Sequence, residues 1–224
     1  MNNYSVHAQE RVRSLMASVF GWMAYALVLT GLASVYVFNS PKIMALIHGN
    51  TGVVIGLVFA QIALVIALSA GVNRLSFGTA LVLFTLYSVL TGAMLSSIFV
   101  VFTLESIAAT FFIAAVMFGA MAFYGATTKA DLTSWGTYLL MAMIGLIVAG
   151  LVNMYMQSSA FQFMISIIGV IVFAALTAWD VQRFKQLAQY ELPEAASLTF
   201  ALSLYLDFIN LFLYLLQFMG QKKE

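Results

Sequence analysis

Long apolar runs, separated by short polar segments, are the main pattern along the chain. A helix needs about 20 apolar residues to cross about 30 Å of hydrocarbon, and seven runs reach that length. None shows the strict alternation of a barrel strand, and each is far longer than the roughly 10 residues that such a strand uses. The runs predict seven transmembrane helices at residues 14–38, 51–70, 76–98, 105–125, 133–156, 161–183 and 196–219.

The boundary between the third and fourth runs is the least marked, because no charged residue lies between Arg74 and Glu105. A segment of that length exceeds a single span, and Glu105 suits a helix N-terminus, where the helix dipole favours an acid. The connections are short, and no linker or low-complexity tract divides them. We therefore expect an all-α, polytopic membrane protein with a single domain over residues 1–224 and a short N-terminal tail at 1–13.

The composition fits a bilayer and excludes several other classes. Hydrophobic residues make up 63% of the chain and charged residues 8%, whereas a soluble domain carries about 25% charged residues. A net charge of +1 gives no basic surface for a nucleic-acid partner. The chain has no cysteine, which excludes thiol catalysis and cysteine-ligated metals. We expect no resident cofactor, and the lipid bilayer is the first predicted partner.

Lysine and arginine residues in the predicted connections favour a cytoplasmic N-terminus. That orientation places six of them inside and three outside. Seven spans then place the C-terminus outside, although Lys222 and Lys223 favour the other side, and a six-span topology with one re-entrant segment stays open. The short connections suggest a bacterial inner membrane. The six inner residues are Arg11, Arg13, Arg74, Lys129, Arg183 and Lys185, and the three outer ones are Lys42, Lys222 and Lys223.

Asp207 is the only acid well inside a predicted span. It lies about 16 Å along the last helix, at about 1.5 Å per residue, which is too deep for its short side chain to reach the interface. An ionisable residue at such a depth marks a pathway, a relay or a pair by default; the alternative is a protonated carboxyl that only packs. Polar residues of this run recur every three or four positions and form one stripe, which must contact protein or water. The stripe consists of Thr199, Ser203, Asp207, Asn210, Tyr214 and Gln217.

Asp180 lies near the cytoplasmic end of the preceding run, where it could be solvated or paired with Arg183. The two runs are consecutive and antiparallel, so Asp180 could meet Asp207, but counting residues leaves Asp207 about 10 Å deeper. Two carboxyls that meet in a poorly solvated site share a proton and titrate as a coupled pair. When both are ionised, they offer the oxygen ligands that Ca²⁺ prefers. Arg74, after the second run, is either a counter-charge for the pair or an ordinary loop residue.

The remaining residues give no sign of enzyme chemistry. The chain has no phosphate-binding glycine loop, no His-Glu-x-x-His and no Gly-x-Ser-x-Gly sequence. Asn153 lies within the fifth run and is interpreted as a hydrogen-bonding partner of a neighbouring helix. The sequence therefore predicts a protein that is not an enzyme.

Two motifs carry a family resemblance. The last run contains Leu-Tyr-Leu-Asp-Phe-Ile-Asn-Leu-Phe at 204–212, and the run before it contains an aromatic-Asp-x-Gln step from Trp179 to Gln182. Together with seven closely connected helices, these motifs resemble the Bax inhibitor-1 family of membrane proteins, in a bacterial form, over essentially the whole chain. The earlier motif is usually Tyr-Asp-Thr-Gln in that family, so Trp179 and Val181 depart from it, and Val181 lacks a hydroxyl beside Asp180.

The resemblance implies both a fold and a function. The implied fold has six helices around a central seventh, with paired aspartates at Asp180 and Asp207 and an arginine counter-charge at Arg74. The implied function is a pH-sensitive Ca²⁺ leak, in which protonation of the pair shifts the balance of closed and open states. Ca²⁺ is then the transported ion and a transient ligand of the pair. The polar residues predicted to support the pair are Ser203, Asn210 and Gln182.

Two other functions compete with a cation leak. An intramembrane aspartyl protease also needs two membrane aspartates, but its Gly-x-Gly-Asp sequence is absent, because Leu204 to Leu206 precede Asp207. The stronger alternative is a regulatory protein without transport, which binds or inhibits a membrane protease or a stress-response complex. Such a binder has no need of a buried acid, so Asp207 favours the leak.

Overall fold

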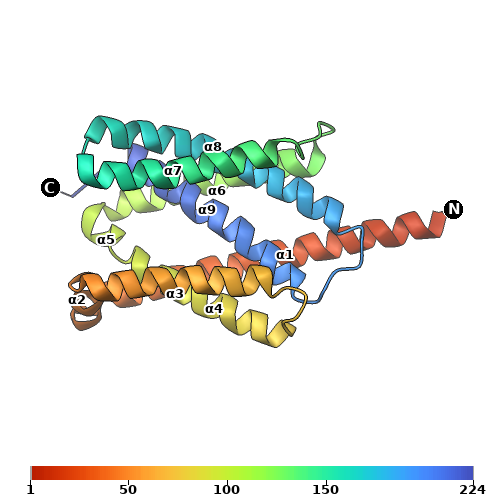
Figure 1. Cartoon of the computed structure of the whole chain (residues 1–224), viewed down its shortest axis with the longest axis horizontal. Coiled ribbons are helices and arrows are strands. Elements are labelled where there is room, and N and C mark those ends of the chain that lie inside the picture. The colour runs from red at the N-terminus through yellow and green to blue at the C-terminus, as the bar shows by residue number, and fades with distance from the viewer. Residues whose placement is uncertain (1, 224) are drawn as a thin grey trace. The chain divides into compact units, whose positions relative to one another are not determined.

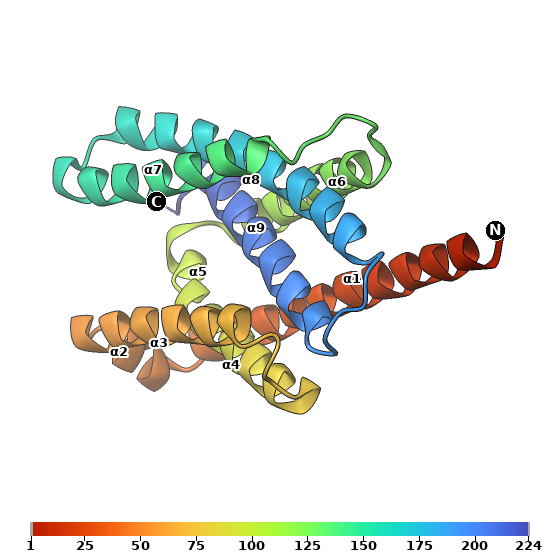
Figure 2. The ribbon, with the colours of Figure 1, turned by 45° about the vertical axis from the view of Figure 1, so that its right-hand side comes forward.

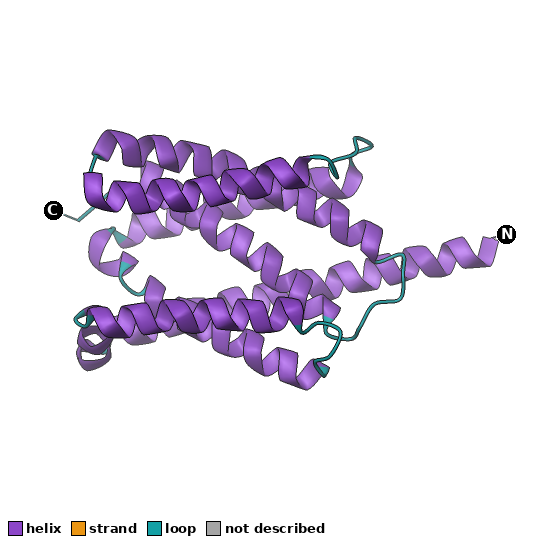
Figure 3. Ribbon diagram, in the orientation of Figure 1, coloured by secondary structure: helices purple, strands orange, loops and turns teal. Residues whose placement is uncertain are grey.

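Helices make up almost all of the chain in the computed structural model, which describes the backbone of residues 2–223 and the side chains of residues 9–223 (Figures 1 and 3). Within residues 2–223 there is no strand, and the extended pairing consists of an isolated bridge between Phe102 and Lys222. The predicted all-α class is confirmed. The helices of this range are α1 (Asn2–Phe38), α2 (Pro41–His48), α3 (Thr51–Ala70), α4 (Phe77–Leu95), α5 (Ile98–Val101), α6 (Leu104–Thr127), α7 (Trp135–Met156), α8 (Ser159–Leu187) and α9 (Ala196–Met219).

Seven helical segments of the described chain are long and apolar enough to cross a membrane. They correspond one by one to the predicted runs, with ends that differ by a few residues, so the prediction of a polytopic membrane protein is confirmed. The segments are Gln9–Phe38, Thr51–Ala70, Phe77–Val101, Leu104–Thr127, Trp135–Met156, Ser159–Leu187 and Ala196–Met219.

Helical structure extends beyond the predicted spans in several places. The helix α1 begins at Asn2, so the residues expected as an N-terminal tail continue the first helix from that point. The sequence does not predict α2, with 8 residues, or α5, with 4, because both are much shorter than a span. The weakly marked boundary falls at Phe102 and Thr103, and Glu105 lies in the first turn of α6, as predicted.

Polar side chains set the starts of three helices. Asn50 before α3, Ser76 before α4 and Thr103 before α6 each accept a hydrogen bond from a backbone N–H in the first helical turn. The first N–H groups of a helix have no partner inside the helix, so a side-chain oxygen at this position stabilises the start. These caps explain why helices begin at the observed residues within long apolar stretches.

Two compact units divide the chain, and α9 contributes to both. Unit 1 comprises Met1–Val101 and Leu187–Tyr205, and unit 2 comprises Phe102–Gln186 and Leu206–Glu224. Among the seven spans α9 is the most buried, with 61% of its apolar stretch inside the protein. The single-domain interpretation and the arrangement of six helices around a central seventh stay predictions.

In unit 1, α1 and α4 approach each other closely at Gly92. A Cβ atom at Gly92 would clash with the backbone carbonyl of Thr30, so only glycine fits there. The Thr30 hydroxyl is 2.7 Å from the Tyr205 hydroxyl, and the two share a hydrogen bond. The rings of Phe84 and Tyr87 pack edge-on against the Tyr205 ring. Tyr205 thereby joins the first part of α9 to α1 and α4.

In unit 2, α7 and α8 run side by side, as Figures 1 and 2 show. The helix α6 packs on α8 at Gly125, where a Cβ atom would clash with the backbone of Ala178. On α9, the ring of Phe208 contacts the rings of Phe111 and Phe118 from α6, with centroids 5.3 and 5.6 Å away. One helix, α6, thus packs against both α8 and the second part of α9.

Candidate functional site

Asp180 of α8 and Asp207 of α9 lie together in unit 2. A side-chain hydrogen bond links the two carboxyls, and each residue is only 6% exposed. This burial excludes a solvated Asp180. Counting residues predicts that Asp207 lies about 10 Å deeper in the membrane than Asp180. The difference in the structure is smaller, because α8 continues to Leu187 and places Asp180 about a turn deeper in its span.

The hydrogen bond between the acids has a chemical requirement. Ionised carboxylates can only accept, so one of the two carboxyls must carry a proton. The second oxygen of Asp207, Oδ2, is buried and has no hydrogen-bond partner among the described residues. A buried acceptor without a partner costs about 1–3 kcal/mol.

The side chains that follow the two acids along their helices are apolar and buried. Val181, beside Asp180, is fully buried, and Phe208, beside Asp207, is 2% exposed. Charges interact strongly where the surroundings are apolar, so two ionised carboxylates would repel each other here far more than in water. Ionisation of both carboxyls would therefore oppose the contact between α8 and α9 at this point.

The other predicted site residues have separate surroundings. Asn210 donates from Nδ2 to the carbonyl of Leu206 on its own helix, at 2.8 Å. Ser203 is half-buried and belongs to unit 1. Arg74 is exposed, in the turn that follows α3, and also belongs to unit 1. The counter-charge role of Arg74 and the supporting roles of Ser203 and Asn210 stay predictions.

Gln182 binds the loop between α6 and α7. Its Oε1 accepts a hydrogen bond from the backbone N–H of Leu132, and its Nε2 donates to the carbonyl of Ala130, both at 2.8 Å. Lys185, one turn further along α8, donates to the carbonyl of Ala126 at 2.7 Å. The sequence does not predict this contact, because the partners of Gln182 are backbone groups whose positions depend on the fold. The end of α8 therefore fixes the loop that precedes α7.

Trp179 and Arg183 complete this end of α8. The indole of Trp179 packs against Gly136 at the start of α7, where an added Cβ would clash with the ring. The Arg183 guanidinium lies over the same indole, 5.0 Å from the ring centroid, which is a cation–π arrangement. Arg183 therefore has a partner other than Asp180, with which its helical spacing had suggested an ion pair.

Replacing Gln182 with alanine is expected to loosen the loop between α6 and α7. The change removes two hydrogen bonds to backbone groups, each worth about 0.5–1.5 kcal/mol. Hydrogen exchange at the Leu132 amide, measured by mass spectrometry in detergent, should become roughly tenfold faster. The control is Gln186→Ala, at an exposed position of the same helix end, which should exchange as the wild type does. Equal exchange at Leu132 in the Gln182→Ala variant and the wild type would contradict the prediction.

The polar stripe of α9 has different partners along its length. Thr199 donates to a carbonyl of α3 in unit 1, at 3.4 Å, and Asp207 pairs with the acid of α8. Near the end of α9, Gln217 accepts a hydrogen bond from Gln162 of α8. Gln162 in turn accepts from Asn153 of α7, at 2.7 Å, which confirms that Asn153 hydrogen-bonds to a neighbouring helix. Three members of the stripe therefore contact neighbouring helices, which agrees with the prediction that the stripe meets protein or water.

A cation that binds at the acid pair would have the carboxylates of Asp180 and Asp207 as its acidic ligands. No group of three or more His, Cys, Asp or Glu side chains that could hold a metal occurs among the described residues. Ca²⁺ takes about 6–8 oxygen ligands, and two carboxylates supply at most four oxygens.

Together, the fold and the site define an integral membrane protein of the all-α, polytopic class, with an acid pair buried between two consecutive spans. A family model described as "Inhibitor of apoptosis-promoting Bax1" matches residues 12–224. The chain therefore belongs to the Bax inhibitor-1 family, and the resemblance carried by its two motifs is confirmed.

Bacterial proteins match the chain over nearly its whole length. The inner membrane protein YbhL of Escherichia coli strain K12 is 47% identical over 224 residues, which cover 97% of this chain and 96% of YbhL. An uncharacterized protein of Borreliella burgdorferi is 43% identical, with 93% and 92% of the two chains covered. An uncharacterized membrane protein of Streptococcus pyogenes is 31% identical, with 99% of each chain covered. The similarity thus includes all seven spans.

Proposed function

We propose that the protein is a pH-sensitive cation leak with Ca²⁺ as the transported ion and no enzymatic activity. The observation that supports this most is the buried acid pair of Asp180 and Asp207, which is joined by a hydrogen bond. With one shared proton, the pair holds α8 to α9. Without that proton, two negative charges repel each other among apolar side chains. A group with these two states is suited to gating.

Gating needs only a difference in proton affinity between two arrangements of α8 and α9. A differential of a few kcal/mol is enough to move a two-state equilibrium. The ionised pair would also offer carboxylate oxygens to a cation that passes between the helices. Arg74 as counter-charge, and Ser203 and Asn210 as supporting polar groups, belong to the same proposal.

The proposed location is the bacterial inner membrane, with the N-terminus in the cytoplasm. The similar protein of E. coli is named an inner membrane protein. In the seven-span topology, six of the nine lysine and arginine residues lie in span ends or connections on the side of the membrane where the first span begins. Such residues are enriched on the cytoplasmic side.

Ca²⁺ flux into proteoliposomes, measured with an enclosed fluorescent indicator, tests the proposal. We expect flux above that of empty vesicles, and a several-fold change in its rate from about pH 5 to about pH 8. Absence of flux at every pH, from protein shown to be helical by circular dichroism, would contradict the leak. That outcome would favour a regulatory protein that binds a membrane protease or a stress-response complex.

A further inference from the structure

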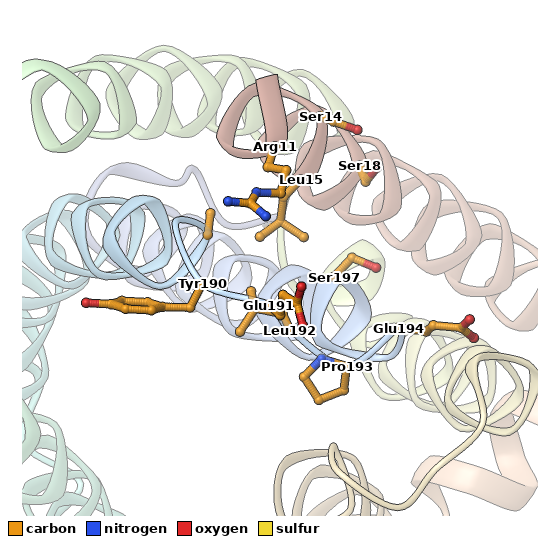
Figure 4. Close-up of a pocket in the computed structure, with 11 residues that line it drawn as sticks. Arg11, Ser14, Leu15, Ser18, Tyr190, Glu191, Leu192, Pro193, Glu194 and Ser197 are labelled. Atoms are coloured by element: carbon orange, nitrogen blue, oxygen red, sulfur yellow. The ribbon is translucent and has the colours of Figure 1, made fainter. Parts of the chain in front are cut away.

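A polar cavity lies in unit 1, between the start of α1 and the connection from α8 to α9 (Figure 4). Its volume is about 550 Å³, which is within the range of about 300–1,000 Å³ that is typical of small-molecule sites. The proposed leak makes no use of it. The charged and hydroxyl side chains that line it are Arg11, Ser14, Ser18, Glu191, Glu194 and Ser197.

Ser197 adds a hydroxyl donor to the cavity. It lies in the first turn of α9, lines the cavity and is only 8% exposed. The start of a helix favours negative charge. A ligand with an anionic oxygen is therefore favoured near Ser197.

The charges around the cavity fit a ligand that carries both signs. The planar guanidinium of Arg11 can bind two phosphate oxygens at once, and serine hydroxyls can donate to the others. The carboxylate of Glu191 can accept from an ammonium group, which has only donors. In Figure 4, Arg11 extends from α1 toward the connection, where the Glu191 carboxylate faces it, whereas the ring of Tyr190 and the carboxylate of Glu194 point away. A lone phosphate would be repelled by the Glu191 carboxylate, and a lone cation by Arg11.

The position of the cavity along the spans matches the head-group layer of a bilayer. Arg11 and Ser14 lie near the start of the first span, and residues 188–195 connect the end of the sixth span to the start of the seventh. An even-numbered span ends on the side where the first span begins, so these parts lie on the same side of the membrane. Head groups occupy the layer from about 15 Å to about 22 Å from the bilayer centre, which is where span ends lie.

We propose that this cavity binds a phosphoethanolamine group. Arg11, Ser14, Ser18 and Ser197 hold the phosphate, and Glu191 holds the ammonium. The group is supplied by phosphatidylethanolamine in the bilayer or by a soluble phosphoethanolamine compound, since both carry the same chemistry. The site is separate from the acid pair and does not depend on the proposed leak.

Native mass spectrometry of the full-length protein in maltoside detergent tests this assignment. The probes are phosphatidylethanolamine, phosphatidylglycerol with the same acyl chains, and glycerophosphoethanolamine, which has no acyl chains. Phosphatidylethanolamine should bind about tenfold more tightly than phosphatidylglycerol, because only the former has an ammonium for the Glu191 carboxylate. Binding of glycerophosphoethanolamine distinguishes a soluble source from a lipid source.

Variants of the cavity test the role of each side chain. Arg11→Gln should weaken phosphatidylethanolamine binding about tenfold, because it removes charge-assisted hydrogen bonds to the phosphate. Ser197→Ala should weaken it roughly three- to tenfold, and Glu191→Gln should abolish the preference over phosphatidylglycerol. The control is Arg13→Gln, on the same exposed turn of α1 but outside the cavity lining, which should bind as the wild type does.

Each result bears on the proposal. Binding of both ethanolamine compounds, weakened by Arg11→Gln, supports the site with a soluble source; binding of the lipid alone, weakened in the same way, supports it with a lipid source. Equal binding of the two lipids by the wild type would overturn the proposal, as would equal binding by the Arg11→Gln and Arg13→Gln variants. Arg11 and Glu191 are exposed, so these variants should fold, and size-exclusion chromatography checks that they do.

Discussion

Asparagine in place of Asp207 is expected to remove the pH dependence of Ca²⁺ flux from a protein that still folds. The asparagine side chain has nearly the same shape and can hydrogen-bond to Asp180, but it carries no titratable proton. Two coupled carboxyls titrate as one system, so Asp180→Asn should have the same effect. In proteoliposomes, the ratio of flux rates between about pH 5 and about pH 8 should fall from several-fold to near one for both variants.

Asp131, in the loop between α6 and α7, provides the matched control for these substitutions. A side-chain hydrogen bond from Thr133 lowers the pKa of Asp131 below its ordinary value of 3.8, and the Thr133 backbone N–H, at 2.9 Å, adds to the effect. A carboxyl with a lowered pKa stays ionised throughout a series that begins above that value. Asparagine keeps an oxygen that can accept from the Thr133 N–H, so Asp131→Asn should leave the loop in place and keep the wild-type pH profile. An unchanged pH response in folded Asp207→Asn protein would remove the acid pair from the mechanism.

Alanine in place of Gly125 is expected to cause a large loss of stability in unit 2. The added Cβ would clash with the carbonyl carbon, carbonyl oxygen and Cα of Ala178. These are backbone atoms, so α6 and α8 would have to move apart. Overpacking of this kind costs about 1–3 kcal/mol, and sometimes more. Thermal unfolding in detergent should occur roughly 5 °C or more below the wild type.

Gly119→Ala separates this clash from the simple loss of a glycine. Gly119 lies on the same helix, and no heavy atom lies within 4 Å of the place where its Cβ would be. Alanine favours a helix over glycine by up to about 1 kcal/mol, so this variant should unfold at the wild-type temperature or slightly above. If the Gly119 and Gly125 variants unfold at the same temperature, the close approach of α6 to α8 does not limit stability.

The spans could be predicted from the sequence because every helix that crosses the hydrocarbon needs a run of about 20 apolar residues. Such runs are visible without any knowledge of the fold. The short helices α2 and α5 do not cross the hydrocarbon and have no such run. The first turns of α1 are also invisible to this criterion, since residues 2–13 are polar enough to be taken for a tail, although a helix needs only internal hydrogen bonds to continue.

The acid pair was partly predictable for a similar reason. A carboxyl such as Asp207 has a high free-energy cost in the hydrocarbon of a bilayer, so its position in the sequence already indicates a partner. The partners of Gln182 could not be predicted in this way. They are a backbone N–H and a backbone carbonyl, which nearly every residue has, so the sequence does not show which of them Gln182 contacts. The role of Arg74 depends on tertiary position rather than on local pattern, and a positive charge in a connection has an ordinary explanation in membrane topology.

Within three residues of α8, Asp180 contacts α9 and Gln182 contacts the loop at 130–132. A helix is stiff over such a short distance, so in the proposed gating a movement of α8 on proton binding would also move that loop, which lies between two spans. Linkage between two sites is reciprocal. In that mechanism, a water-soluble molecule that binds the loop would change the proton affinity of a carboxyl inside the membrane.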